Sequence, residues 1–360
     1  SEEGSEEVSN GSFSQEGAQL VTNGSFNTDS DWTKGTGWII SGGTANCDGV
    51  SGASPIYQNI GSATIGKTYK IQLDVSNYTS GTLVAAYGGT SAVGITSNGS
   101  YIFYVKATST DANTSYLSYN FIGSIDNVSV REVGQDWIFS TGWSIGEDIA
   151  NCSGGAAQVL YQANLIPIGT QYKLTFTVSN FSQGYLSAYG GDWDAQGVIQ
   201  ANGTFTIYTE KLATSNTGFV GNGFVGSITN ISVKEVGQNW TLGTGWSIGS
   251  SELIATSMSN QFVTQSFNFT SGKRYRASFS VTGTNSLPNN VSLRLPYDGD
   301  VSNIAFVNQN SDGVYSQEFV SNGSSTLYLG YGSFTGTITN ITIIEITDDT
   351  NLPRINYEGF

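Results

Sequence analysis

The stretch Trp32-Thr-Lys-Gly-Thr-Gly-Trp38 occurs three times in this chain of 360 residues. It returns as Trp137-Ile-Phe-Ser-Thr-Gly-Trp143 and as Trp240-Thr-Leu-Gly-Thr-Gly-Trp246, at offsets of 105 and 103 residues. Self-similarity at a nearly fixed period is the signature of a repeat architecture. The sequence therefore predicts three homologous domains of nearly equal length.

Alternating side chains mark the strands inside each copy. Tyr69-Lys-Ile-Gln-Leu-Asp-Val75 has an apolar residue at every second position, and matching runs begin at Tyr172 and Tyr275. A period of two is that of a half-buried strand. Asn-Gly, Ser-Gly and Asp-Gly steps between the runs favour tight turns, and a helical period is absent. These patterns predict an all-β fold of three tandem antiparallel β-sandwich domains of the jelly-roll type.

The repeats divide the chain into units joined by very short connections. We predict an acidic N-terminal segment with a partial repeat, three jelly-roll repeats, and the start of a further domain or linker, at residues 1–17, 18–134, 135–237, 238–347 and 348–360. Because three residues separate Val133 from Trp137, the domains should abut and form a semi-rigid rod. A thin rod gains rigidity by association, so we also expect a homo-oligomer.

The N-terminal region contains one short motif twice. Leu20-Val-Thr-Asn-Gly-Ser-Phe26 reads as an extra entry strand of the first repeat, and we expect later repeats to use the closing strand of their predecessor instead. Val8-Ser-Asn-Gly-Ser-Phe13 echoes this motif thirteen residues earlier, and we interpret it as the remnant of another unit. The chain opens at Ser1 without a methionine, which indicates a processed product or a piece of a longer protein.

Composition excludes several classes of function. The chain has no histidine, so it lacks an imidazole base and a histidine-ligated metal. Thirteen basic and 28 acidic residues give a net charge of −15, which should repel nucleic acid and anionic lipid. No stretch approaches the roughly 20 apolar residues of a membrane helix, so membrane insertion is not expected. Cys47 and Cys152 occupy the same position in different repeats, so we expect two buried free thiols and no disulfide between them.

The repeats resemble carbohydrate-binding modules of the family 4/9 type. The resemblance rests on the entry motif ending at Phe26, the Gly-Trp step at Trp38, the alternating strand from Tyr69, and the closing run Ile125-Asp-Asn-Val-Ser-Val130. It implies a jelly-roll sandwich that binds sugar in a cleft beside the second strand. The direct abutment of the repeats, and the tail Leu352-Pro-Arg-Ile-Asn-Tyr357, are similar to virion proteins of tailed bacteriophages that infect Bacteroidetes-type hosts.

Two kinds of aromatic residue are candidates for sugar binding. The six repeated tryptophans recur beside glycine within a strand pattern, so we interpret them as core residues. The resemblance places the carbohydrate-binding aromatics beside the second strand, at Tyr87, Tyr189, Trp193 and Tyr297. Trp193 lies in the loop Gly190-Gly-Asp-Trp-Asp194 and has no aromatic counterpart in the first repeat. A packing role between domains is the alternative interpretation of Trp193.

The resemblance also implies a structural calcium ion. Modules of this family hold the ion with an acidic residue after the entry motif and with the aspartate of the closing run. Asp29 and Asp126 match these positions in the first repeat, whereas Thr229 and Thr339 replace the aspartate in the other two. Calcium is therefore expected in the first repeat at most, and no other cofactor is expected.

No catalytic constellation recurs among the three copies, so we predict that the chain is not an enzyme. The recurrent carboxylates, Glu132, Glu235 and Glu345, end the closing strands and suit a structural role. The leading hypothesis is a bacteriophage virion component, a head or tail fibre or a capsid decoration, that displays glycan-binding domains to the host surface. Its partners would be other virion proteins and host glycans, and its place the virion surface. The alternatives are a carbohydrate-binding array of a secreted bacterial glycanase or adhesin, and a purely structural spacer.

Overall fold

The computed structural model describes residues 3–189, 197–259, 261–283, 291–294, 304–309, 311–321, 323, 325–330 and 333–347, with backbone only at 291–294 and 304–309. Strands, turns and loops make up this part of the chain. It contains no helix that is long and apolar enough to cross a membrane. The prediction of an all-β fold is confirmed.

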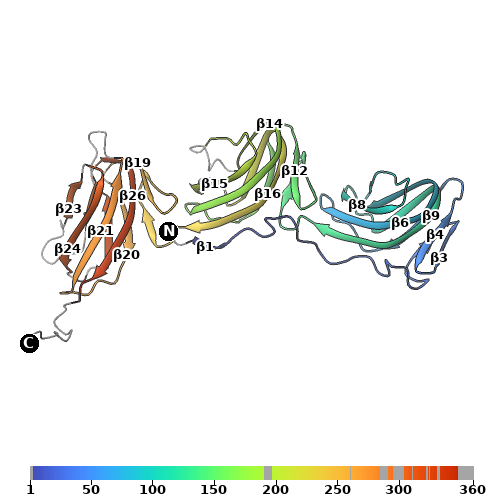
Figure 1. Cartoon of the computed structure of the whole chain (residues 1–360), viewed down its shortest axis with the longest axis horizontal. Helices are drawn as coiled ribbons and strands as arrows, with labels where there is room; N and C mark the ends of the chain where they lie inside the picture. The colour runs from blue at the N-terminus through green and yellow to red at the C-terminus, as the bar shows by residue number, and fades with distance from the viewer. Residues whose placement is uncertain are drawn as a thin grey trace, which may run out of the picture.

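The strands fall into three sets that follow the sequence repeats (Figure 1). The first set is β2 (Thr33–Lys34), β3 (Trp38–Ser41), β4 (Thr44–Asp48), β5 (Ala53–Asn59), β6 (Thr68–Tyr87), β7 (Thr90–Ser91), β8 (Gly99–Lys106) and β9 (Asn113–Val133). The second set is β10 (Ile138–Phe139), β11 (Trp143–Gly146), β12 (Ile149–Ser153), β13 (Gln158–Gln162), β14 (Gln171–Ala188), β15 (Gly203–Glu210) and β16 (Thr217–Val236). The third set is β17 (Trp240–Leu242), β18 (Trp246–Ile248), β19 (Leu253–Ser259), β20 (Phe262–Ser266), β21 (Arg274–Thr282), β22 (Val291–Arg294), β23 (Ile304–Gln309), β24 (Gly313–Val320), β25 (Thr326–Gly330) and β26 (Ser333–Glu345). One further strand, β1 (Glu3–Glu6), precedes them all.

Each repeat is a sandwich of two antiparallel sheets. In the third repeat the sheets have the orders β18-β19-β26-β21-β24 and β17-β20-β25-β22-β23. In the first repeat β6 and β9 are long enough to serve both sheets, and their pairing shifts register between Ser76 and Ser80. Asn77 and Asn120 lie at this bend with φ of 54° and 53°, a left-handed conformation that asparagine tolerates better than most residues. Bent long strands therefore join the two sheets.

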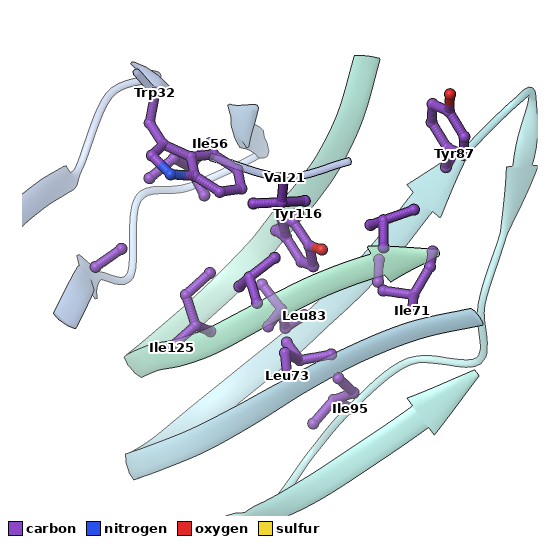
Figure 2. Packing of buried hydrophobic residues seen from close by; sticks show 14 of the residues in the cluster. Val21, Trp32, Ile56, Ile71, Leu73, Leu83, Tyr87, Ile95, Tyr116 and Ile125 are labelled. Atoms are coloured by element: carbon purple, nitrogen blue, oxygen red, sulfur yellow. The ribbon is translucent and has the colours of Figure 1, made fainter. Parts of the chain in front are cut away.

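Three separate hydrophobic cores fill the three sandwiches. Tyr69, Ile71, Leu73 and Val75 are buried in the first core, as their alternation predicts. Figure 2 shows part of this core, where Val21, Trp32, Ile71, Leu83 and Tyr116 lie among its strands. Figure 1 shows the three domains one after another in sequence order. That this row behaves as a rigid rod stays a prediction.

Five of the six repeated tryptophans are buried, as expected of core residues: Trp32, Trp38, Trp137, Trp143 and Trp246. The second tryptophan of each repeat donates its indole N–H to a backbone carbonyl 15 or 16 residues later, Trp38 to Ser54 at 3.1 Å, Trp143 to Gln158 at 3.0 Å and Trp246 to Gln261 at 3.4 Å. The sixth, Trp240, is only partly buried at the edge of the third core.

Residues 3–13 of the N-terminal segment fold into the second repeat, whereas Glu16 and Gly17 bond to the closing strand of the first. Strand β1 pairs with β16, placing Glu3 opposite Val236, and the side chains of Val8 and Phe13 belong to the second core. In Figure 1 the chain runs from the N-terminus along the second domain before it enters the first. For the second repeat, the expectation that the preceding closing strand supplies the entry strand is wrong, because residues 3–13 supply it from far away in the sequence.

Both cysteines are buried and free, and they lie in different cores. The Cys47 thiol contacts the Ser118 hydroxyl at 3.4 Å, and burial raises the pKa of the Cys152 thiol. The prediction of two buried thiols without a disulfide between them is confirmed.

Candidate functional site

The outer face of one sheet of the second repeat carries a pair of stacked tyrosines. Tyr161 on β13 and Tyr189 after the end of β14 have ring centroids 4.8 Å apart and an interplanar angle of 22°. Both side chains are half-buried. They point outward because Leu160, Gln162, Leu186 and Ala188, their neighbours in the alternation, are buried.

A glycine between the two tyrosines makes the stack close. Gly218 on β16 lies opposite Tyr161, and its carbonyl accepts the backbone N–H of Tyr189 at 3.0 Å. A Cβ atom on Gly218 would lie 2.1 Å from the Leu160 carbonyl oxygen and 2.8 Å from the Tyr161 Cβ. Only a residue without a side chain fits there, so the rings meet directly above the backbone of β16.

The same row extends to the edge strand and is bordered by polar groups. Ile138 on β10 pairs with Tyr161 and is 45% exposed, so the row crosses four strands, a width of about 14 Å. Tyr185 and Asn222 lie opposite each other on the same face farther along β14 and β16. A flat aromatic surface with hydroxyl and amide groups beside it suits a ligand that has both apolar and polar faces.

The other repeats carry related but different aromatics on the corresponding sheet. In the third repeat, Phe262 and Tyr328 form an edge-to-face pair with centroids 5.7 Å apart. In the first repeat, Tyr57 and Tyr119 face outward but lie opposite Ser115 and Ala53, at separate points along the sheet. Of the described aromatics on these three faces, the second repeat alone has a parallel stack.

Tyr87 lies in the core and not on this face. Its side chain is 2% exposed, its ring meets Tyr69 edge-on at 4.8 Å, and its hydroxyl donates to the Gly61 carbonyl at 2.8 Å. Burial raises the pKa of Tyr87 to about 12. Leu83 corresponds to Leu186, an offset of 103 residues, whereas Tyr87 and Tyr189 are 102 residues apart. That difference of one residue reverses the face on which the tyrosine stands.

Two of the predicted sugar-binding residues, Trp193 and Tyr297, lie outside the described residues. The structure thus places Tyr189 on the aromatic face and adds Tyr161, which sequence reasoning missed. The signal was available in Gln158-Val-Leu-Tyr-Gln162, where the alternation sets Val159 and Tyr161 opposite to the buried Leu160.

Each of the two predicted calcium ligands has a partner within the chain. The Asp29 carboxylate forms an ion pair with the Lys34 ammonium, and an Asp126 carboxylate oxygen accepts the backbone N–H of Asn127 at 2.7 Å. This ion pair would have to break before Asp29 could bind calcium. No group of three or more Cys, Asp or Glu side chains suited to a metal occurs in the part of the chain that the structure describes.

Asp74 and Asp126 are the carboxylates that most resemble a catalytic pair, because they are direct neighbours across β6 and β9. Hydrogen bonds from Ser100 and from the Asn127 amide hold the pKa of Asp74 below its usual value. A glycosidase acid needs the opposite shift. Threonine or serine stands at these positions in the other repeats, so the pair is not a shared feature.

Comparisons with known proteins give little beyond the structure itself. No protein-family model matches the chain, and no curated protein matches it. Solved structures that match include the N-terminal CBM22-1-CBM22-2 tandem domain of Xyn10C from Paenibacillus barcinonensis, at 11% identity and a TM-score of 0.23. The match covers 59% of this chain and 94% of that one. At that TM-score the likeness establishes neither a common fold nor a common function.

Proposed function

We propose that this chain is a non-catalytic array of β-sandwiches that binds glycans through the outer faces of its sheets. The observation that carries the proposal is the half-buried stack of Tyr161 and Tyr189 across Gly218. The C–H groups of a pyranose ring pack on such an aromatic surface, while the sugar hydroxyls reach the amide and hydroxyl groups at its border. The net charge of −15 favours an uncharged glycan over an acidic one.

The position of Tyr189 depends on contacts beneath the face. The buried Lys211 ammonium donates to the Tyr189 carbonyl at 3.4 Å, and the Tyr189 N–H is bonded to β16. The backbone under the ring is thus fixed from two sides before a ligand arrives. A preordered aromatic surface loses little conformational freedom on binding.

The proposal is tested on the whole chain by glycan-array screening, followed by titration calorimetry with the best uncharged ligand. Tyr161→Ala and Tyr189→Ala should each weaken binding at least tenfold, since each removes half of the stack. Trp193→Ala should also weaken it, if the unrepeated tryptophan contacts the same ligand. The control is Ile39→Ala, which removes a 60% exposed apolar side chain from β3 in the first repeat, away from the stacked tyrosines. This variant should bind normally.

Failure has a clear form in this experiment. Binding that survives both tyrosine substitutions would refute the aromatic face as the site, and the absence of any glycan ligand would favour the purely structural spacer. Hydrolysis of a bound oligosaccharide would refute the non-catalytic part of the proposal.

We propose two alternative biological settings for this glycan-binding chain. A virion fibre or decoration protein and a secreted or surface-attached carbohydrate-binding array would both use such a face to hold a cell-surface or polymeric glycan. Mass spectrometry separates them, because the chain would be found in purified bacteriophage particles in the first setting and in the bacterial secreted or envelope fraction in the second.

A further inference from the structure

The first and second repeats are each completed by an N-terminal segment of thirteen residues. Residues 14–26 complete the first repeat, and the described part of residues 1–13, from Glu3 onward, completes the second, with a glycine, asparagine and phenylalanine at matching places. Phe26 packs on Trp32 with ring centroids 5.1 Å apart, and Phe13 packs on Trp137 at 5.2 Å. The two segments are therefore bound in the same way.

The tryptophan of each repeat also recognises the segment through a hydrogen bond. The indole N–H of Trp32 donates to the Asn23 carbonyl at 3.0 Å, and that of Trp137 donates to the Asn10 carbonyl at 3.0 Å. Both asparagines have φ of 50°, which turns the chain back over the indole. The tryptophan thus binds the segment by its ring face and by its N–H group.

A buried glutamine holds the residue before each asparagine. Gln58 bonds both backbone groups of Thr22 at 2.8 Å, and Gln162 accepts from the Ser9 N–H at 3.3 Å and donates to the Ser9 carbonyl at 2.5 Å. This two-point contact mimics a strand neighbour, so it fixes the register of the segment.

The glycine of each segment lies against the closing strand. The Gly24 carbonyl accepts the Val128 N–H at 2.9 Å, and the Gly11 carbonyl accepts the Ile231 N–H at 2.9 Å. A Cβ atom on Gly24 or Gly11 would lie within about 2.0 Å of the carbonyl oxygen of that same partner. The close approach admits glycine alone, which makes this position a sharp test of segment binding.

The third repeat has the same receptor positions, and none of the described residues fills them. The equivalents of the tryptophan, the glutamine and the closing-strand residue are Trp240, Gln265 and Ile341. All three are only partly buried, whereas their counterparts in both other repeats are buried. The indole N–H of Trp240 and the amide of Gln265 have no hydrogen-bond partner among the described residues.

Two of these positions, Trp240 and Ile341, line an open groove. The groove has a volume of about 230 Å³, and its other lining residues include the apolar Ile248, Leu253 and Ile338. Strand β26 continues past Ile338 beyond the end of its pairing with β19, so within the described chain its edge from residue 340 onward is open on that side. An apolar groove next to an open strand edge accepts an extended peptide.

We propose that the groove of the third repeat binds a third entry segment, an extended peptide of the Val-Ser/Thr-Asn-Gly-Ser-Phe type supplied from outside residues 1–360. Its phenylalanine packs on Trp240, the carbonyl of its asparagine accepts the indole N–H, and Gln265 brackets the residue before that asparagine. Its glycine carbonyl accepts the Ile341 N–H.

The charges beside the groove differ in the third repeat. Ten residues before the phenylalanine, each known segment has a glutamate, Glu16 or Glu3, whose carboxylate lies 2.6 Å from the ammonium of Lys70 or Lys173. The third repeat has Arg276 at this position, and its guanidinium already pairs with the Glu318 carboxylate at 2.7 Å. The occupant therefore needs no acidic residue there, and the close glycine contact is the feature that distinguishes a peptide of this type from an oligosaccharide.

The test uses the full chain and a synthetic peptide of residues Ser1–Phe13 with an amidated C-terminus, followed by calorimetry and hydrogen exchange. One peptide should bind per chain and slow amide exchange at residues 338–345, since the second groove keeps its own tethered segment. The matched control peptide with Gly11→Ala should bind at least tenfold more weakly. The chain variant Gln265→Ala should likewise lose affinity at least tenfold.

A chain extended ahead of Ser1 by a second copy of residues 1–13 gives an independent measurement, because Gly4, near the start of β1, lies beside the side chain of Gln238, two residues before Trp240. This extension should protect residues 338–345, and its Gly11→Ala form should not. Equal binding of both peptides, or no binding up to about 1 mM, would overturn the proposal. Protection confined to the second repeat, or a groove that binds oligosaccharide and not peptide, would overturn it too.

Discussion

Replacing Phe13 by alanine should destabilise the second domain, although the first domain lies between them in the sequence. The Phe13 side chain is 1% exposed and packs on Trp137 at 5.2 Å and on Phe139 at 6.2 Å. Removing a fully buried phenylalanine ring costs about 3–5 kcal/mol. Because the segment lies at the edge of the core and can partly relax, we expect the lower end of this range.

Hydrogen exchange measured by mass spectrometry reads the two domains separately. A loss of about 3 kcal/mol corresponds to exchange about 150-fold faster for the most protected amides. These amides should lie in β16 for Phe13→Ala, with β9 unchanged. The matched variant Phe26→Ala should accelerate β9 and leave β16 unchanged, since Phe26 packs on Trp32 of the first core.

The pair of variants makes the reasoning refutable. If Phe13→Ala accelerated exchange in β9, residues 1–13 would belong to the first domain. If it changed neither strand, the segment would contribute no core contact. Either result would also remove the basis for the binding groove inferred in the third repeat.

Two further predictions concern ionisation and metal. Because burial raises the pKa of Tyr87 to about 12, its contribution to stability should be complete below about pH 10 and be lost as the pH rises toward 12. Tyr87→Phe should flatten the pH dependence of the urea midpoint over this interval. The flattening should be partial, because burial also raises the pKa of Tyr116. Millimolar calcium should leave the melting temperature of the first domain unchanged, because Asp29 is paired with Lys34; a rise of several degrees that Asp126→Ala abolishes would show a bound ion.

Local patterns in the sequence were enough to predict the strands and the cores. The alternation from Tyr69 to Val75 and the recurring tryptophans specify which side chains are buried, because burial of one face is a property of a few consecutive residues. The side of the sheet on which Tyr87 and Tyr189 lie was harder to predict. Both precede a Gly-Gly pair, and aligning the repeats on this motif places them one residue out of register. The buried Leu83 and Leu186 are the better anchors, because packing in the core fixes them.

The partner of each entry segment could not be read from local patterns. Phe26 lies six residues from Trp32, whereas Phe13 lies 124 residues from Trp137, yet the two contacts have nearly the same geometry. Because Val8–Phe13 precedes the first repeat directly, the sequence favoured its interpretation as a remnant of another unit, and a contact with the distant second repeat was not expected. The informative signal was the equal length of residues 1–13 and 14–26, since two equal segments ahead of several equal domains suggest one segment per domain.

The order of the segments has a mechanical consequence, because it is the reverse of the order of the domains. The boundary between the first two domains is crossed by the chain twice, once from Val133 to Trp137 and once from Phe13 to Glu16, which pairs with Val133. Two connections on one boundary resist bending about either of them. Within the described residues a single connection, from Val236 to Trp240, crosses the next boundary. Filling the third groove with a segment that continues into Glu3 would add the second connection there, so binding of the segment should stiffen the whole row of domains as well as complete the third core.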